Sequence, residues 1–130
     1  NSGINAVPIE FAQMCKKNNH KVIIITSVES SKNLQSRTID NKHLYECGDI
    51  VIDNHSPHGD AIVNTKYGNI GAVSSIINSY IAQSLVLEIV NLYIENNLVP
   101  PIYMSANVNG GDEHNKKIYE EYKKRVKSLY

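Results

Sequence analysis

The sequence predicts a single α/β domain of three layers, in which helices cover both faces of a parallel sheet. Residues 21–27 (KVIIITS) and 49–53 (DIVID) are short continuous runs rich in β-branched side chains, which is typical of strands buried on both faces. Helical patterns precede and separate these runs, so helix and strand alternate along the chain. With 130 residues, the chain is long enough for one hydrophobic core.

The first predicted element is a helix over residues 5–18. Apolar side chains recur there at helical spacing, namely Ile4, Val7, Phe11, Met14 and Cys15. Asn18 and Asn19 are expected to end the helix. Ser2 and Gly3 come directly before this helix. A hydroxyl and a glycine before a helix start are typical of an anion-binding turn, because the free helical N–H groups face the ligand.

The middle of the chain alternates loops with short elements. Residues 28–42 are polar and rich in serine and are predicted as a loop, and residues 43–48 (HLYECG) as a brief helical segment. After the second strand, residues 54–69 contain many turn-forming residues and are predicted as another loop.

The longest predicted element is a helix over residues 72–97. Nearly all of its positions are apolar. The exceptions form one narrow polar stripe, which consists of Ser84, Glu88, Asn91 and Glu95. Such a helix must bury most of its circumference, so the sequence favours a second partner such as another subunit, in a dimer or tetramer. The polar residues argue against a membrane span, and we expect a soluble protein without a membrane partner.

The C-terminal part is predicted to be an extended segment followed by a helix. Pro100 and Pro101 end the long helix, and residues 101–108 (PIYMSANV) are expected to be extended. Asp112 is the expected N-cap of a terminal helix with one apolar face: Ile118, Tyr119, Tyr122, Val126 and Leu129. The domain therefore divides into residues 1–98, with the sheet and its helices, and residues 99–130.

Composition excludes some classes of function. The 13 basic residues balance the 13 acidic residues, so no strong field would attract nucleic acid. Cys15 and Cys47 have no CxxC spacing, and no signal peptide precedes them. This favours two reduced thiols in a cytoplasmic protein.

Hydroxyl residues gather at predicted strand ends and helix starts. Ser2, Ser27 after Thr26, and Ser74 with Ser75 all lie at such positions. Ligands of open α/β sheets bind at the carboxyl ends of strands, and helix starts with hydroxyls bind phosphate. The alternative is that each hydroxyl only caps a helix.

Two polar clusters are further candidates for chemistry. One combines ligand types for Zn or Mn around the second strand: Asp49, Asp53, His55, His58 and Asp60. It matches no zinc motif, and the alternative is a hydrogen-bonded loop shaped by turn residues. In the other cluster His114 follows Asp112 and Glu113, and it is either a general acid or base or an exposed residue at a helix start.

Several segments resemble the sugar isomerase (SIS) domain family. They are NSGINAVPIEFA, VIIITS, LYECGDIVIDNHSPHGDA, NIGAVSSIINSYIAQSLVLEIV and PPIYMSANVNGGDEHN. The chain looks most like uncharacterised bacterial SIS proteins described as phosphosugar or phosphoheptose isomerases. The resemblance implies a flavodoxin-like or Rossmann-like fold with a five-stranded parallel sheet, dimeric or tetrameric. It also implies that this chain is a partial SIS domain, incomplete at its N-terminus, whose missing N-terminal half is a partner.

The resemblance also implies the ligand and its site. A sugar phosphate would bind with its phosphate on Asn1, Ser2, Gly3 and Ser27, and its sugar on Ser74 and Ser75. No cofactor is expected. The catalytic and metal-binding positions of phosphoheptose isomerases fall on Ser79, Tyr80 and Ala82, so their mechanism does not carry over.

Three functions follow as hypotheses. The first is a sugar-phosphate isomerase of the aldose–ketose type, with His114, Glu88 or His55 as the base. The second is a phosphosugar-binding sensor module without catalysis, which the absent isomerase motif favours. The third is a metal-dependent hydrolase built on His55, His58 and Asp60.

Overall fold

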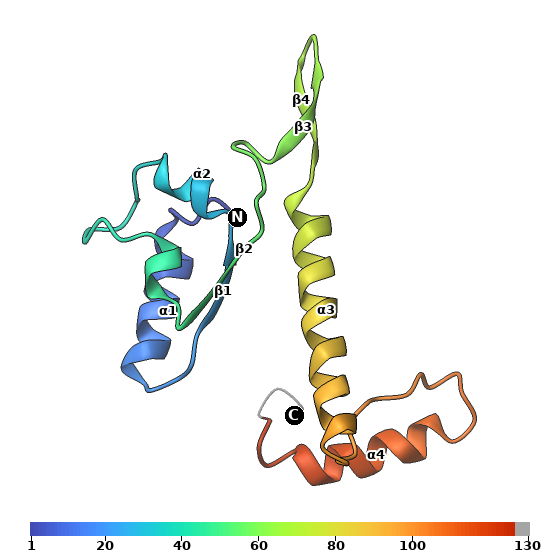
Figure 1. The fold of residues 1–130 in the computed structure, drawn as a ribbon. Coiled ribbons are helices and arrows are strands. Elements are labelled where there is room, and N and C mark those ends of the chain that lie inside the picture. Colours follow the sequence, from blue (N-terminus) through green and yellow to red (C-terminus); the bar gives the residue numbers. More distant parts are fainter. Residues whose placement is uncertain (127–130) are drawn as a thin grey trace. The chain divides into compact units, whose positions relative to one another are not determined.

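The computed structural model describes residues 1–126 and has a mixed α/β fold with one small parallel and one small antiparallel sheet (Figure 1). The chain forms two compact units, Asn1–Leu85 and Val86–Tyr130. The first unit contains these elements in order: α1 (Ala6–Lys17), β1 (Ile23–Thr26), α2 (Val28–Lys32), the 3₁₀ turn η1 (Leu44–Cys47), β2 (Ile50–Asp53), β3 (Ala61–Thr65), β4 (Gly68–Ala72) and the start of α3 (Ser74–Glu95).

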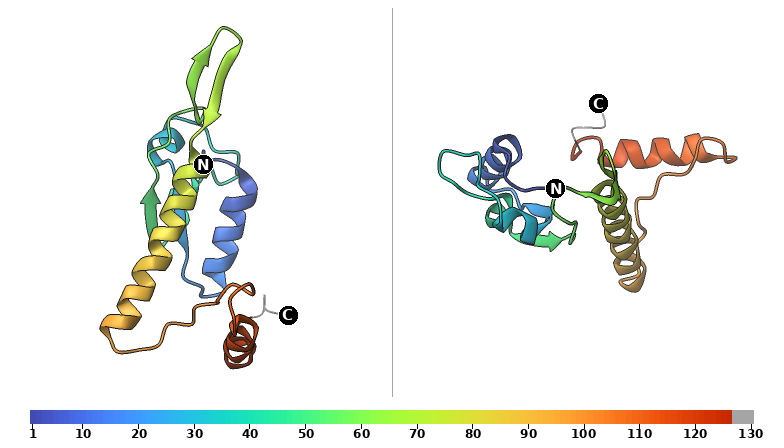
Figure 2. Two further views of the ribbon diagram at one scale, coloured as in Figure 1. Left: turned by 90° about the vertical axis from the view of Figure 1, so that its right-hand side faces the viewer. Right: turned by 90° about the horizontal axis from the view of Figure 1, so that it is seen from above.

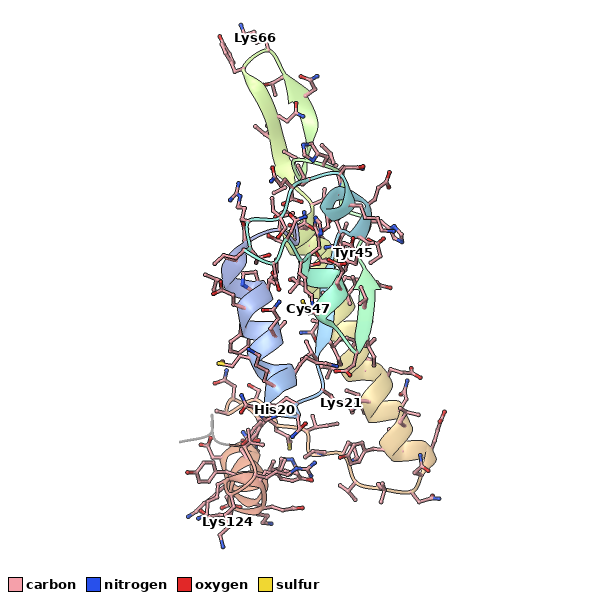
Figure 3. All side chains as sticks on the ribbon, turned by 90° about the vertical axis from the view of Figure 1, so that its left-hand side faces the viewer. His20, Lys21, Tyr45, Cys47, Lys66 and Lys124 are labelled. Atoms are coloured by element: carbon pink, nitrogen blue, oxygen red, sulfur yellow. The ribbon has the colours of Figure 1, made fainter. Side chains whose placement is uncertain are left out.

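The core of the first unit lies between α1, β1 and η1. Ile9 and Ala12 of α1 pack against Ile24 of β1 and Cys47 of η1. Figure 3 marks Cys47 beside α1 and the two strands. β1 and β2 pair in parallel, as the sequence predicts, with Ile24 opposite Val51.

The prediction that these strands are buried on both faces is wrong for the described residues. Ile23 and Ile50 are register partners, and they are 55% and 56% exposed. Side chains alternate between the two faces of a sheet, and the core formed by α1 and η1 lies on the face of Ile24. The mixed α/β class is confirmed, whereas the described residues form a two-stranded parallel sheet instead of a five-stranded one.

Two predicted loops contain regular structure. Residues 28–42 begin with α2, and residues 54–69 contain β3 and most of the hairpin that it forms with β4. The hairpin is antiparallel, with Val63 opposite Ile70 and Thr65 opposite Gly68, so Lys66 and Tyr67 form its tip. Figure 3 labels Lys66 at this tip.

Helix α3 is continuous over 22 residues, close to the predicted range of 72–97 (Figure 2). Among residues 1–126 it is the one helix long and apolar enough to cross a membrane, judged by length and composition alone. Most of its large apolar side chains are exposed.

The second unit consists of the end of α3, an extended segment and α4 (Gly111–Tyr122). The N-cap of α4 is Gly110 and not Asp112, which lies inside the first turn because the helix begins at Gly111. The side-chain amide of Asn115 holds the extended segment: Met104 N–H donates to Asn115 Oδ1 at 2.8 Å, and Asn115 Nδ2 donates to the Met104 carbonyl at 2.7 Å. On the predicted apolar face of the helix, Leu129 lies outside the described residues.

Candidate functional site

The predicted anion-binding turn before α1 is closely packed. Gly3 is buried with a φ of 65°, and its carbonyl accepts a hydrogen bond from Leu44 N–H at 2.8 Å. The Ser31 hydroxyl donates to the Ser2 carbonyl at 2.5 Å. A methyl carbon built on Gly3 would lie 2.1 Å from Ser31 Oγ. Gly3 therefore allows the close approach of α2.

Asn1 lies at the end of β1, beside another predicted phosphate ligand. Its carbonyl accepts hydrogen bonds from Ser27 N–H at 3.1 Å and from Thr26 Oγ1 at 2.7 Å. Its side-chain oxygen accepts from Asn54 Nδ2 at 3.0 Å, and the same amide group donates to Asn78 Oδ1 at 2.8 Å. The structure thus brings Asn1 and Ser27 together and adds Asn54 and Asn78 to the cluster.

The Ser27 hydroxyl is buried and already bonded. It donates to the Ser56 carbonyl at 2.6 Å, and Ser30 Oγ donates to the same carbonyl at 3.1 Å. A hydroxyl has one proton, so in this arrangement the Ser27 side chain can only accept a further hydrogen bond. Among residues 1–126, Ser56 Oγ is buried without a hydrogen-bond partner.

A cavity of about 470 Å³, which we call the Ser2 cavity, opens beside this turn. Polar and apolar groups both line it, and the lining residues are Asn1, Ser2, Ile4, Asn5, Ser30, Leu34, Arg37, Pro57, His58, Gly59 and Asp60. Arg37 is fixed at the start of α1, where its N–H donates to the Ile4 carbonyl at 2.9 Å and its Nη1 donates to Asn5 Oδ1 at 2.9 Å. Asn5 is the N-cap residue of α1, yet its side chain makes no cap hydrogen bond. The first turn of α1 therefore begins at the cavity wall without a side-chain cap.

A second cavity of about 370 Å³, the Ser56 cavity, shares Ser30, Pro57 and His58 with the first. Its other lining residues are Ser27, Glu29, Asn33, His55 and Ser56. The His55 side chain is 81% exposed, and its Nδ1 lies 3.5 Å from Asp53 Oδ2. Although burial opposes it, hydrogen bonds from the backbone N–H groups of His55 and Val28 hold the pKa of Asp53 below its ordinary value.

Ser74 and Asp60 connect the cavity wall to α3. Asp60 accepts two hydrogen bonds from Ser74, from the hydroxyl at 2.6 Å and from the backbone N–H at 2.8 Å. These bonds lower the pKa of Asp60, so its carboxylate is ionised at neutral pH. Ser75 is exposed, and its carbonyl accepts from Ser79 Oγ at 2.7 Å. Of the two predicted sugar ligands, only Ser74 bonds to a cavity residue.

The other two candidate bases belong to the second unit. Glu88 is exposed on α3. His114 Nε2 lies 2.9 Å from the Ile102 carbonyl, so this ring nitrogen is the donor and Nδ1 is left for other chemistry.

The predicted metal ligands do not gather. Among the described residues there is no group of three or more His, Cys, Asp or Glu side chains that could hold a metal ion. Asp49 instead bonds to Lys16 Nζ at 2.5 Å and Val22 N–H at 2.8 Å, at the opposite end of β2 from Asp53. The loop thus matches the alternative interpretation, in which polar side chains shape turns.

Sequence reasoning missed Arg37 and Ser30, which line the Ser2 cavity, and Asn54, which bonds to Asn1. Arg37 lies in a loop without a motif, and the only available signal was that it is one of two arginines in the chain. Ser30 was hidden in a segment predicted as a loop, and Asn54 acts through contacts distant in sequence.

Comparisons with known proteins give a family name different from the one the sequence suggested. The chain is 42% identical to a UPF0309 protein of Thermoanaerobacter pseudethanolicus, over 98% of this chain and 53% of that protein. It is 40% identical to a UPF0309 protein of Geobacillus thermodenitrificans and 35% identical to one of Listeria innocua, over 98% of this chain and 52% and 53% of those proteins. No model of a known protein family matches the chain.

The assignment to the SIS family is therefore wrong, because the proteins that match nearly all of the chain carry another name and no family model supports it. The interpretation of the chain as a truncated member of that family is therefore wrong as well. The chain spans about half the length of the curated relatives it matches. It is similar to UPF0309 proteins over 98% of its own length.

Proposed function

We propose that the Asn1–Leu85 unit binds a sugar phosphate in the Ser2 cavity. The observation that carries the proposal is the position of Arg37 beside the uncapped start of α1. A guanidinium forms paired hydrogen bonds with a phosphate, and free N–H groups at a helix start favour negative charge. The hydroxyls of Ser2 and Ser30 line the same cavity.

The other side of the cavity suits the hydroxyl groups of a sugar. His58 and Asp60 line it, and the ionised carboxylate of Asp60 can accept hydrogen bonds but would repel a phosphate. This polarity orients the ligand, with its phosphate at Arg37 and its hydroxyls toward Asp60. A volume of about 470 Å³ lies within the range of small-molecule sites.

The reaction we propose is aldose–ketose isomerisation, which needs a base to move a proton between adjacent carbons. Among the candidates, His55 lines the cavity that adjoins the Ser2 cavity and forms a pair with Asp53. The alternative is a sensor that binds the sugar phosphate without catalysis. The large exposure of the His55 side chain favours that alternative, because bulk water surrounds the proposed base.

Calorimetric titration with glucose 6-phosphate tests the binding proposal. We expect Arg37→Ala to weaken binding at least about tenfold, since it removes a charge-assisted contact to the phosphate. Arg125→Ala, which changes the other arginine, should leave the affinity unchanged. Equal affinities of the wild type and Arg37→Ala, or equal binding of unphosphorylated glucose, would contradict the proposal.

Proton exchange separates the isomerase from the sensor. An isomerase incubated with the sugar phosphate in D₂O incorporates deuterium at C2, whereas a sensor binds without exchange. If His55 is the base, His55→Gln should abolish exchange and keep the affinity. The same experiment with His114→Gln and Glu88→Gln assigns the base if exchange persists in His55→Gln.

We further propose a cytoplasmic protein whose parallel sheet carries a second helical layer on its other face. Free Cys15 and Cys47 support the compartment, because reduced thiols are typical of the cytoplasm. The exposed pair Ile23 and Ile50 supports the second layer, because an uncovered apolar sheet face is unfavourable in water. Protection of the methyl NMR signals of these two side chains from a soluble paramagnetic agent would test the layer.

A further inference from the structure

The Ser2 cavity has a neighbour of similar size. The Ser56 cavity, of about 370 Å³, shares Ser30, Pro57 and His58 with the Ser2 cavity, of about 470 Å³. Each volume alone lies within the range of small-molecule sites. Pro57 and His58 are exposed, so a ligand longer than one sugar ring can pass over them from one cavity into the other.

The charges of the Ser56 cavity do not suit a second phosphate. Of the residues that the structure describes, no lysine or arginine lines this cavity, whereas Glu29 does. The carboxylate of Glu29 accepts hydrogen bonds and repels anions. The Asn33 amide, which can both donate and accept, lines the same cavity. These groups favour an uncharged polar occupant.

The serine hydroxyls of the Ser56 cavity favour an occupant that donates hydrogen bonds. Ser27 Oγ and Ser30 Oγ both donate to the Ser56 carbonyl, so each can only accept a further hydrogen bond. Ser56 is 2% exposed, and its Oγ has no hydrogen-bond partner among residues 1–126. A hydroxyl can turn among staggered positions, so an occupant of the cavity would give it a partner. Sugar hydroxyls, which donate and accept, match this set.

We propose that the two cavities together bind one disaccharide phosphate, with its phosphorylated ring in the Ser2 cavity and its reducing ring in the Ser56 cavity. This inference rests on the proposed function, because Arg37 still holds the phosphate. The position of His55 gives the direction, since it lines the Ser56 cavity and is not among the residues described around the Ser2 cavity.

The reducing ring carries the carbons on which the isomerase would act. In the open-chain form of that ring, His55 would take the proton from C2 and return it to C1, while the hydroxyl proton moves from O2 to O1. The aldose thereby becomes a ketose without any co-reactant. A sensor would bind the same disaccharide phosphate and leave it unchanged.

Calorimetric titration with cellobiose 6′-phosphate, whose phosphate is on the non-reducing ring, tests the inference. The disaccharide should bind at least about tenfold more tightly than glucose 6-phosphate, because its second ring adds hydrogen bonds. Asn33→Ala and Ser56→Ala should each weaken its binding about fivefold and leave the affinity for glucose 6-phosphate unchanged. Asn64→Ala is the matched control, since Asn64 is exposed on β3 and is not among the residues described around either cavity. Circular dichroism checks that the variants stay folded.

Chemical modification of histidines by diethyl pyrocarbonate gives a second readout. Cellobiose 6′-phosphate should slow the modification of His55, whereas glucose 6-phosphate should not, and His114 in the second unit should respond to neither. Equal affinities of the wild type for the two phosphates, or unchanged binding of the disaccharide by both Asn33→Ala and Ser56→Ala, would overturn the inference. The proposed function would survive that result if Arg37→Ala still weakened the binding of glucose 6-phosphate. If neither phosphate binds the wild type, the proposed function and this inference are both wrong.

Discussion

Substitution of Gly3 by alanine should destabilise the first unit by more than the strain of its backbone conformation alone would explain. Gly3 has a φ of 65°, and the left-handed conformation costs a residue with a side chain about 1–2 kcal/mol. The new methyl group would also lie 2.1 Å from Ser31 Oγ, which is fully buried. Ser31 must then move and lose its hydrogen bond to the Ser2 carbonyl, at about 1 kcal/mol.

The expected total is about 2.5 kcal/mol, of which about 1.5 kcal/mol comes from the backbone and about 1 kcal/mol from the lost hydrogen bond. Gly59→Ala is the matched control, because Gly59 has a φ of 79° and nothing lies within 4 Å of its added methyl group. It should cost only the backbone part, about 1.5 kcal/mol. The difference between the two variants isolates the close approach of α2.

The buried thiol of Cys47 reports opening of this unit. Burial raises the pKa of Cys47, so its thiol reacts slowly in the folded state and at the rate of a free thiol once exposed. We expect Gly3→Ala to speed its labelling about sixtyfold and Gly59→Ala only about twelvefold. The double variant Gly3→Ala/Ser31→Ala should recover part of the loss. Equal labelling rates in the two glycine variants would refute the reasoning.

Three further predictions concern polar groups. Ser27→Ala should destabilise the first unit by about 1 kcal/mol in urea unfolding, since it removes a buried hydrogen bond. Ser56→Ala should be neutral or stabilising, because the Ser56 hydroxyl has no partner among residues 1–126. Asn115→Ala should accelerate hydrogen exchange at Met104 N–H at least about tenfold, and Lys116→Ala should leave it unchanged. The pKa of Asp60 is lowered on folding, so its contribution to the free energy of unfolding is complete above the ordinary carboxyl pKa and is lost as pH falls through the folded value. Asp60→Asn should therefore make the free energy of unfolding fall less steeply as the pH is lowered.

Local periodicity predicted the longer elements. Helix α1, the strands β1 and β2 and the long helix α3 all appear in the structure near their expected bounds. The predicted apolar face of α1 is wrong in part, because the helix buries Ile9 and Ala12 and leaves Val7, Phe11 and Met14 exposed. The hairpin was missed because Gly68 and Gly71 lower strand propensity and its tip is read as a turn. The five residues of α2 are too few for a helical period.

The candidate site was predictable only in part. The hydroxyls at strand ends and helix starts were identified, and Asn1 and Ser27 do meet. Their hydrogen-bond partners were not predictable, because Ser27 bonds to Ser56 and Asn1 to Asn54, contacts between segments far apart in sequence. Arg37 was missed for the same reason, since its role depends on the backbone of Ile4.

The hairpin of β3 and β4 also has a practical consequence. Its two-residue tip, Lys66 and Tyr67, is solvent-exposed, and neither residue lines the Ser2 cavity or the Ser56 cavity. Exposed turn tips tolerate inserted sequence. A fluorescent reporter or affinity peptide inserted between Lys66 and Tyr67 would give a handle for immobilising the protein and following ligand binding while both cavities stay intact.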